Sequence, residues 1–154
     1  MRKEKVIAII TLLLFVAGGA FAKNKFSISA GGGGDVSYDL ETDTMVFGFN
    51  GFVDFTYLLL SAGVNIIKKD VGFSAAANLK FPFNLTDSLS IFPTAGAEYR
   101  RFNKVNSFLL NAGVGVDFSI GANVFARLCA LYVFSPKDFK NGKLTLRPSV
   151  GFRF

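Results

Sequence analysis

The chain has 154 residues, of which 51% are hydrophobic, with 16 glycines, 19 phenylalanines, no histidine and a formal charge of +6. This length fits a single domain. Only one apolar run, near the N-terminus, approaches the length of a membrane-spanning helix, so a helical bundle in lipid is excluded. The lack of histidine excludes Ser-His and Cys-His nucleophiles and histidine-ligated metal sites, which argues against most enzymes.

The N-terminal segment is typical of a secretory signal peptide. A basic start is followed by an aliphatic stretch, and small residues occupy the positions that a signal peptidase reads, Ala20 and Ala22. We therefore expect a signal peptide at 1–22 and one domain at 23–154. A retained membrane anchor is the alternative reading. The only cysteine, Cys129, is far from the cleavage site, so neither a lipid anchor nor an intramolecular disulfide is expected.

From Phe26 onward, apolar and polar residues alternate with a period of two, which is the pattern of β-strands. The pattern recurs in eight segments, which cover residues 26–30 before a glycine tract, 47–55, 58–66, 71–83, 89–100, 108–120, 124–134 and 144–154. We expect longer loops at one end of these strands, at 35–44, 68–70, 103–107 and 136–143. Tighter turns at 54–57, 84–88 and 121–123 would then lie at the other end, as in an up-and-down antiparallel meander.

The composition of the two strand faces indicates which face meets lipid. One face is almost purely apolar, whereas the other is rich in Gly, Ser, Asn, Ala and Thr with isolated charges, which suits the interior of a narrow barrel. Aromatic residues near the strand ends are typical of interfacial girdles. Eight strands of ~9–11 residues use roughly 80 residues and leave the rest for connections. We predict an all-β, eight-stranded antiparallel up-and-down transmembrane β-barrel. A secreted soluble β-barrel binding protein is the alternative.

The C-terminal strand carries the most specific pattern. Val150, Phe152 and Phe154 alternate to the last residue, and this ending, with Lys80-Phe-Pro-Phe83 and Ala95-Gly-Ala-Glu-Tyr99, resembles the small OmpA/OmpX-like outer-membrane β-barrels of diderm bacteria. The resemblance implies an outer-membrane location and a monomer in contact with outer-membrane lipid and a lipopolysaccharide-type surface. It also implies that the C-terminal strand is recognised by the outer-membrane assembly machinery.

Charged residues on the polar face are expected to point into the lumen. They are Asp54, Lys80, Glu98, Arg100, Asp117, Arg127, Arg147 and Arg153. Asp117 and Arg127 are nearly equidistant from the 121–123 turn, so we expect them to face each other, with Glu98 and Arg147 farther along the barrel. Because buried charges are costly unless paired or wetted, this set predicts a largely filled polar lumen and a structural or surface-interaction role. The alternative is a narrow channel for small ions or hydrophobic solutes.

No catalytic, cofactor or metal site is predicted. The carboxylates of the first expected loop, Asp35, Asp39, Glu41 and Asp43, lack the spacing of a calcium loop and are read as solvated. The basic residues are dispersed, so nucleic-acid binding is not expected. Lipid-modifying barrel enzymes resemble one another in using a catalytic histidine, which this chain lacks, and enzymatic activity is therefore not expected.

Overall fold

The computed structural model describes residues 26–67 and 70–154; the predicted signal peptide, with Ala20 and Ala22, lies outside them. The described chain forms strands β1 (Ile28–Asp39), β2 (Thr44–Phe55), β3 (Leu58–Ile67), β4 (Asp70–Lys80), β5 (Phe83–Asn84), β6 (Leu89–Phe102), β7 (Val105–Ser119), β8 (Val124–Ser135) and β9 (Asp138–Arg153). Among these residues, no helix is long and apolar enough to cross a membrane.

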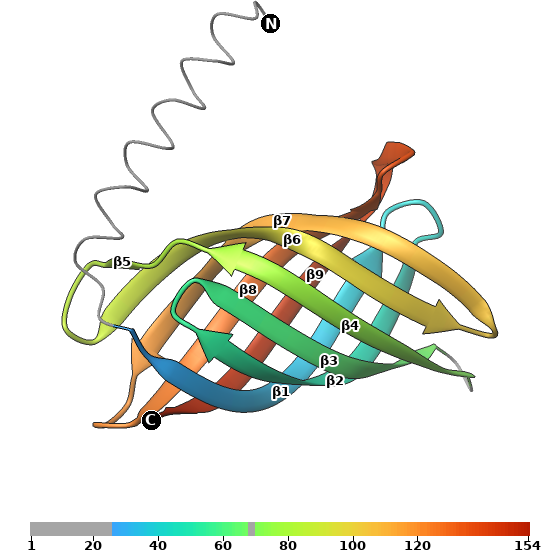
Figure 1. The fold of residues 1–154 in the computed structure, drawn as a ribbon. Helices are drawn as coiled ribbons and strands as arrows, with labels where there is room; N and C mark the ends of the chain where they lie inside the picture. Colours follow the sequence, from blue (N-terminus) through green and yellow to red (C-terminus); the bar gives the residue numbers. More distant parts are fainter. Residues whose placement is uncertain (1–25, 68–69) are drawn as a thin grey trace, which may run out of the picture.

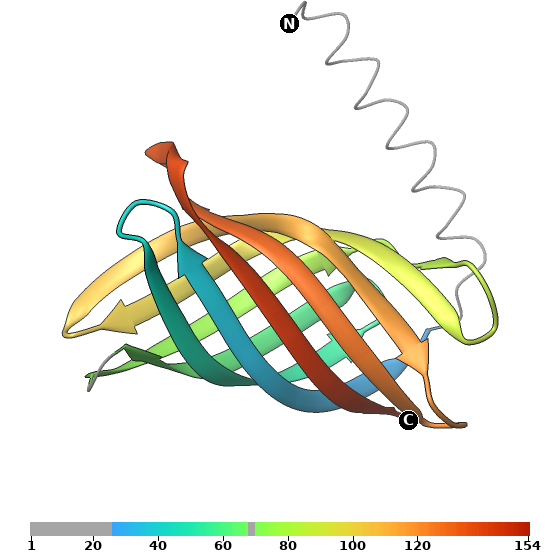
Figure 2. The ribbon, with the colours of Figure 1, turned by 180° about the vertical axis from the view of Figure 1, so that it is seen from behind.

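Eight long strands form a closed antiparallel barrel, as the alternation predicts. Consecutive strands pair with one another, β1 pairs with β9, and β4 pairs with β6 (Figures 1 and 2). The two-residue β5 pairs only with β6 and belongs to the connection between β4 and β6. Closure leaves no unpaired sheet edge around the body of the barrel, so its backbone hydrogen bonds can be satisfied without water.

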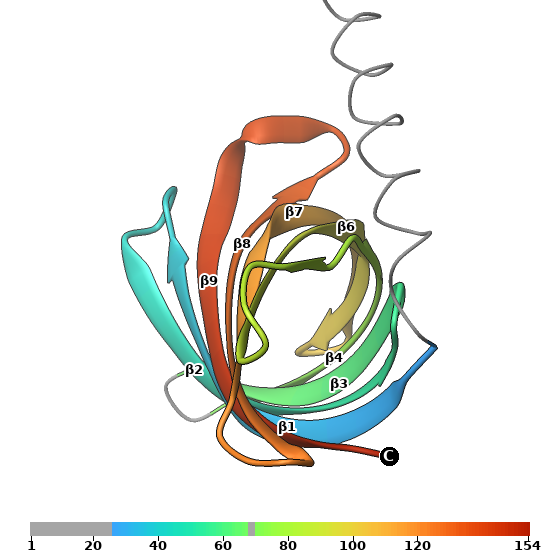
Figure 3. The ribbon, with the colours of Figure 1, turned by 90° about the vertical axis from the view of Figure 1, so that its left-hand side faces the viewer.

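The barrel has two distinct ends. The end that carries the C-terminus and the turns at 56–57, 81–88 and 120–123 is called the terminal end here, and Figure 3 looks along the barrel from it. The far end carries the hairpins between β1 and β2, β3 and β4, β6 and β7, and β8 and β9. The β8–β9 hairpin stands away from the wall of the barrel at this end (Figure 1).

The prediction of long loops at one end is wrong. The described far-end connections cover only 40–43, 103–104 and 136–137, and the longest connection is 81–88 at the terminal end. Asn103 and Lys104 both have positive φ, which suits a two-residue hairpin turn that matches the twist of its strands. Strand pairing therefore continues to Phe102 and Val105, through polar residues that the sequence pattern assigned to a loop.

The first strand also extends farther than predicted. β1 runs through the glycine tract to Asp39, where the sequence suggested a loop from Asp35. A Cβ atom on Gly31 would lie 2.2 Å from the carbonyl oxygen of Val150, and one on Gly33 would lie 2.0 Å from that of Pro148. Glycine at these positions thus allows β1 to approach β9 and close the barrel.

The barrel is polar inside and apolar outside. Along β7, Asn111 and Asp117 are 2% and 5% exposed, whereas Phe108 and Phe118, on the opposite face, are 61% and 53% exposed. Polar and charged side chains outnumber apolar ones among the buried residues. This inversion of the usual soluble pattern matches a barrel whose outer face contacts hydrocarbon.

Candidate functional site

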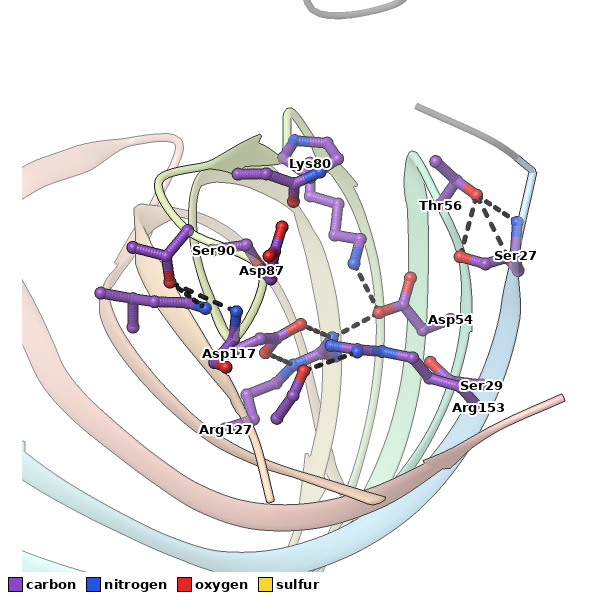
Figure 4. Close-up of a pocket in the computed structure, with 16 residues that line it drawn as sticks. Ser27, Ser29, Asp54, Thr56, Lys80, Asp87, Ser90, Asp117, Arg127 and Arg153 are labelled. Atoms are coloured by element: carbon purple, nitrogen blue, oxygen red, sulfur yellow. Dashed lines mark hydrogen bonds and ion pairs between the residues drawn. The ribbon is translucent and has the colours of Figure 1, made fainter. Parts of the chain in front are cut away.

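Four of the predicted lumen charges form one group near the terminal end. This terminal ion cluster consists of Asp54, Lys80, Asp117 and Arg127 (Figure 4). Lys80 Nζ lies 2.6 Å from Asp54 Oδ2, and Arg127 donates from Nε and Nη2 to the two oxygens of Asp117 at 2.6 and 2.8 Å. Arg127 Nη2 also donates to Asp54 Oδ2. Asp117 and Arg127 are directly opposed on β7 and β8, so these two residues do face each other as expected.

Three phenylalanine rings surround the Arg127 guanidinium. Its Cζ lies 4.7 Å from the ring centroid of Phe52 and 5.0 Å from those of Phe92 and Phe125. Rings at this distance attract a cation through their quadrupoles, and the effect is larger when the cation is desolvated. Sequence reasoning missed these rings because it treated the lumen as filled by small residues. Phe52 and Phe125 share the alternating rows of Asp54 and Arg127, and Phe92 shares the row of Glu98, so these positions could have revealed the rings.

A second group lies toward the far end. This far ion cluster consists of Asp35, Glu98, Arg100 and Arg147. Arg147 donates from Nε to Asp35 Oδ2 at 2.8 Å and from Nη2 to Glu98 Oε2 at 3.0 Å, while Arg100 Nη2 donates to Glu98 Oε1 at 2.6 Å. Glu98 is fully buried.

The position of Asp35 corrects the sequence analysis. Asp35 is 4% exposed and lies inside the lumen, instead of in a solvated loop, because β1 continues past it. It shares the inward row of β1 with Ser29 and Ser37, and the Ser37 hydroxyl donates to Asp35 Oδ1 at 3.1 Å. The sequence shows that Ser29, Asp35 and Ser37 are all at odd-numbered positions. However, the four glycines between Ala30 and Asp35 have no side chains, so they cannot show that the alternation continues.

Apolar side chains also fill part of the lumen. Phe92, Cys129, Leu131 and Val133 form a buried group inside the barrel, and Cys129 and Leu131 border a small cavity between the two clusters. The cavity at this level measures only about 20 Å³ and is bordered by Arg127 on one side and Arg147 on the other. A volume of this size holds about one water molecule. The interior is therefore filled by side chains at mid-height.

Several buried polar atoms have no hydrogen-bond partner among the described residues. They are Asp54 Oδ1, Arg127 Nη1, Asn78 Oδ1 and both side-chain polar atoms of Asn111. Such atoms usually bond to ordered water or to a ligand, because leaving them unpaired is costly. The lumen thus keeps unused hydrogen-bonding capacity in spite of its ion pairs.

A vestibule of about 470 Å³ opens above the terminal ion cluster. Asp54, Asp117 and Arg127 form part of its lining, and hydroxyl side chains such as Ser29 and Ser90 surround them (Figure 4). The vestibule is lined by groups that donate and accept hydrogen bonds. In the described parts of the chain, no group of three or more Cys, Asp or Glu side chains is placed to hold a metal ion.

The last predicted lumen charge, Arg153, lies in the vestibule apart from both clusters. Its Nη1 donates to Ser119 Oγ at 2.8 Å, and its Cζ lies 4.9 Å from the Phe125 centroid. No ion pair joins Arg153 to a carboxylate within residues 26–67 and 70–154. The guanidinium is therefore held by a hydroxyl and a ring.

Two residues of the predicted assembly signal are on the outer face of β9, and the third, Phe154, follows the strand directly. Val150, Phe152 and Phe154 are 50%, 54% and 84% exposed, and the Phe154 N–H donates to the carbonyl oxygen of Ile28 at 2.9 Å. These residues flank the β1–β9 seam that closes the barrel. Their recognition by assembly machinery stays a prediction.

The fold is similar to that of several solved outer-membrane barrels. The N-terminal β-barrel domain of Pseudomonas aeruginosa OprF aligns with a TM-score of 0.61 at 13% identity, over 84% of this chain and 100% of that domain. The attachment invasion locus protein Ail of Yersinia pestis aligns with a TM-score of 0.56 at 14% identity, over 84% and 97% of the two chains. OprG of P. aeruginosa aligns with a TM-score of 0.55 at 11% identity, over 84% and 96%.

No protein-family model and no curated protein matches the sequence. Identities this low establish the architecture alone. The chain has the fold of the small eight-stranded outer-membrane β-barrels.

Proposed function

We propose that this chain, which has the fold of the small outer-membrane barrels, is an integral outer-membrane protein of a diderm bacterium with a structural or surface-interaction role. Its lumen serves as a rigid, side-chain-filled core and does not conduct solutes. The protein is monomeric and contacts outer-membrane lipid through its apolar face.

The observation that carries this proposal is the position of Arg127. Its guanidinium is bonded to Asp54 and Asp117, enclosed by three phenylalanine rings and almost fully buried. A charge held by two carboxylates and three rings is expensive to displace, because an uncompensated buried charge would result. The far ion cluster lies beyond Arg127, and only a cavity of about 20 Å³ lies between Arg127 and Arg147, so side chains obstruct the lumen at two successive levels.

Recording in planar lipid bilayers tests the closed lumen. The purified, refolded protein should insert without producing stable conductance steps. A preparation of a known large-pore porin serves as the positive control for insertion and recording. Reproducible nanosiemens-scale steps from the pure protein would contradict the proposal.

A narrow channel is the second candidate. The unpaired polar atoms of Asn78 and Asn111, together with the small cavity that Asn78 borders, favour ordered water at mid-height. Under this alternative, conductance would be small but steady, and it would fall when the Asn78 or Asn111 side chain is replaced by leucine. The absence of any current in the unsubstituted protein would dismiss it.

The far end supports a role at the cell surface. Tyr132, Phe134 and Phe139 stack with centroid separations of 4.7 to 5.7 Å on the β8–β9 hairpin, and Phe139 is 66% exposed. The same hairpin carries Lys137 and Lys140, both exposed. Aromatic and cationic side chains together suit the anionic headgroup region of a lipopolysaccharide-type surface. Stronger retention on anionic than on zwitterionic lipid vesicles, lost when both lysines become glutamine, would support this contact.

The proposed role is not catalytic. The chain contains no histidine, and its buried carboxylates are engaged by arginine or lysine. Incubation with lipid A and phospholipid should therefore release no fatty acid and transfer none. Turnover in that assay would contradict the proposal.

A further inference from the structure

The vestibule at the terminal end has the size of a small-molecule site. Its volume of about 470 Å³ falls within the range of known ligand pockets, roughly 300–1,000 Å³. It is open at the terminal end, and Arg127, which also borders the small cavity beyond it, lies between the vestibule and the interior. A solute could enter from the terminal end and stop there.

The charges that line the vestibule balance. Lys80, Arg127 and Arg153 contribute three positive charges, and Asp54, Asp87 and Asp117 contribute three negative charges. Within the terminal ion cluster each carboxylate is already paired with a cation. The lining as a whole therefore carries no net charge, and Arg153 is the one of its three cations without a carboxylate partner among the described residues.

What remains unused in the vestibule is hydrogen-bonding capacity. Asp54 Oδ1 and Arg127 Nη1 have no hydrogen-bond partner among the described residues, and both are buried atoms of residues that line the vestibule. Ser29 lies opposite Asp54 in the strand register and Ser90 lies opposite Asp117, so a hydroxyl flanks each carboxylate. Neither serine hydroxyl has a hydrogen bond to another side chain in the described structure, and both line the vestibule. Acceptors and donors are thus interleaved at its base.

We propose that this vestibule binds a neutral polyhydroxylated solute, a mono- or disaccharide unit. Sugar hydroxyls can exchange hydrogen bonds with the Ser29 and Ser90 side chains. Once side-chain adjustment exposes Asp54 Oδ1 and Arg127 Nη1, a sugar hydroxyl can donate to the first and a sugar oxygen can accept from the second. This pairing satisfies the buried polar atoms without disturbing an ion pair. The proposal goes beyond the membrane role and does not depend on whether the lumen conducts.

Titration of the refolded, full barrel in lipid nanodiscs, followed by amide NMR, tests the proposal. Sucrose should cause saturable shifts at Ser29, Ser90 and Ser119, with a dissociation constant in the millimolar range expected for a small open polar site. Glutamine, a zwitterion, and inorganic phosphate should bind at least tenfold more weakly or not at all. A soluble N-acetylamino-sugar disaccharide is titrated separately, because a preference for it over sucrose would identify a glycan chain, and not a free sugar, as the source of the ligand.

Variants localise the site. The double substitution Ser29→Ala with Ser90→Ala should weaken sucrose binding about tenfold, as two neutral hydrogen bonds are lost. Ser90→Phe should abolish binding by filling the vestibule. Ser74→Ala is the matched control, since Ser74 is a lumen serine toward the far end that accepts from Asn65 Nδ2, and it should bind sucrose normally. Each variant is first checked for the compact, unboiled gel band of a folded barrel.

Three results would overturn the proposal. They are the absence of saturable shifts with either sugar, tighter binding of phosphate or glutamine than of sugar, and an equal loss of binding in Ser74→Ala and the vestibule variants. None of these results depends on conductance, so failure here and failure of the closed-lumen proposal can be told apart.

Discussion

Replacing Arg127 with alanine should destabilise the barrel more than any other single removal of a charge. The substitution leaves Asp54 with Lys80 alone and leaves Asp117 without an ion-pair partner in the described part of the chain. The side chains of Asp54 and Asp117 are only 2% and 7% exposed, so both carboxylates are largely desolvated where the guanidinium holds them. The three surrounding rings would also lose their cation.

The magnitude follows from the cost of an uncompensated buried charge. Removing one partner of a buried ion pair typically costs about 3–5 kcal/mol, and we expect Arg127→Ala to fall in this range. Arg127→Met combined with Asp117→Asn should recover most of the loss, because Lys80 still neutralises Asp54 and no unpaired carboxylate is left in the cluster. Such recovery would be direct evidence of coupling between Arg127 and Asp117.

Reversible urea unfolding in lipid vesicles measures these free energies. Arg101→Ala is the control, since Arg101 is exposed at the far end and its removal should cost about 0.5 kcal/mol or less. A loss below about 1 kcal/mol for Arg127→Ala would refute the reasoning, because it would mean that the terminal ion cluster is hydrated and not a desolvated plug.

Two further substitutions test the closure and the outer face, each against a matched control. Gly33→Ala should lower the free energy of unfolding by about 1–3 kcal/mol, because the new Cβ would meet the Pro148 carbonyl. Gly34→Ala is the control: its Cβ has its nearest contact at 3.8 Å, so the loss should be about 0.5 kcal/mol or less. Equal losses would contradict the close approach of β1 and β9. Val114→Arg, on the outer face of β7, should cost about 2–4 kcal/mol in vesicles, whereas Thr42→Arg, in the far-end turn between β1 and β2, should cost about 1 kcal/mol or less. If Val114→Arg left the free energy of unfolding unchanged, this face would not contact hydrocarbon. Both comparisons use the same urea assay.

The sequence predicts the architecture well because apolar and polar residues alternate along most of the strands. The alternation assigned Asp117, Arg127 and Glu98 to the lumen and Phe108 and Phe118 to the outside, and the structure agrees. Eight strands follow from the same pattern and from the length of chain needed to cross a membrane.

The strand ends, the position of Asp35 and the rings around Arg127 could not be predicted from this alternation. Asp35 was assigned to a loop because Gly31 to Gly34 have no side chains that could display an alternation. The strand segments that begin at Val105 and Asp138 were not predicted, because the polar residues near the hairpin turns show no clear alternation. The phenylalanine rings around Arg127 come from β2, β6 and β8, so their meeting is set by barrel register and not by local sequence.

The central claim is that the apolar face contacts lipid and the polar face lines the lumen. Spin labels placed one at a time at positions 110–118 of β7, in a Cys129→Ser background in lipid vesicles, test it directly. Accessibility to oxygen, which concentrates in hydrocarbon, should be high at the even positions, including Val114, and low at the odd positions, including Asn111 and Asp117. High accessibility of the even positions to a water-soluble nickel reagent, with no oxygen signal, would contradict a membrane-spanning barrel.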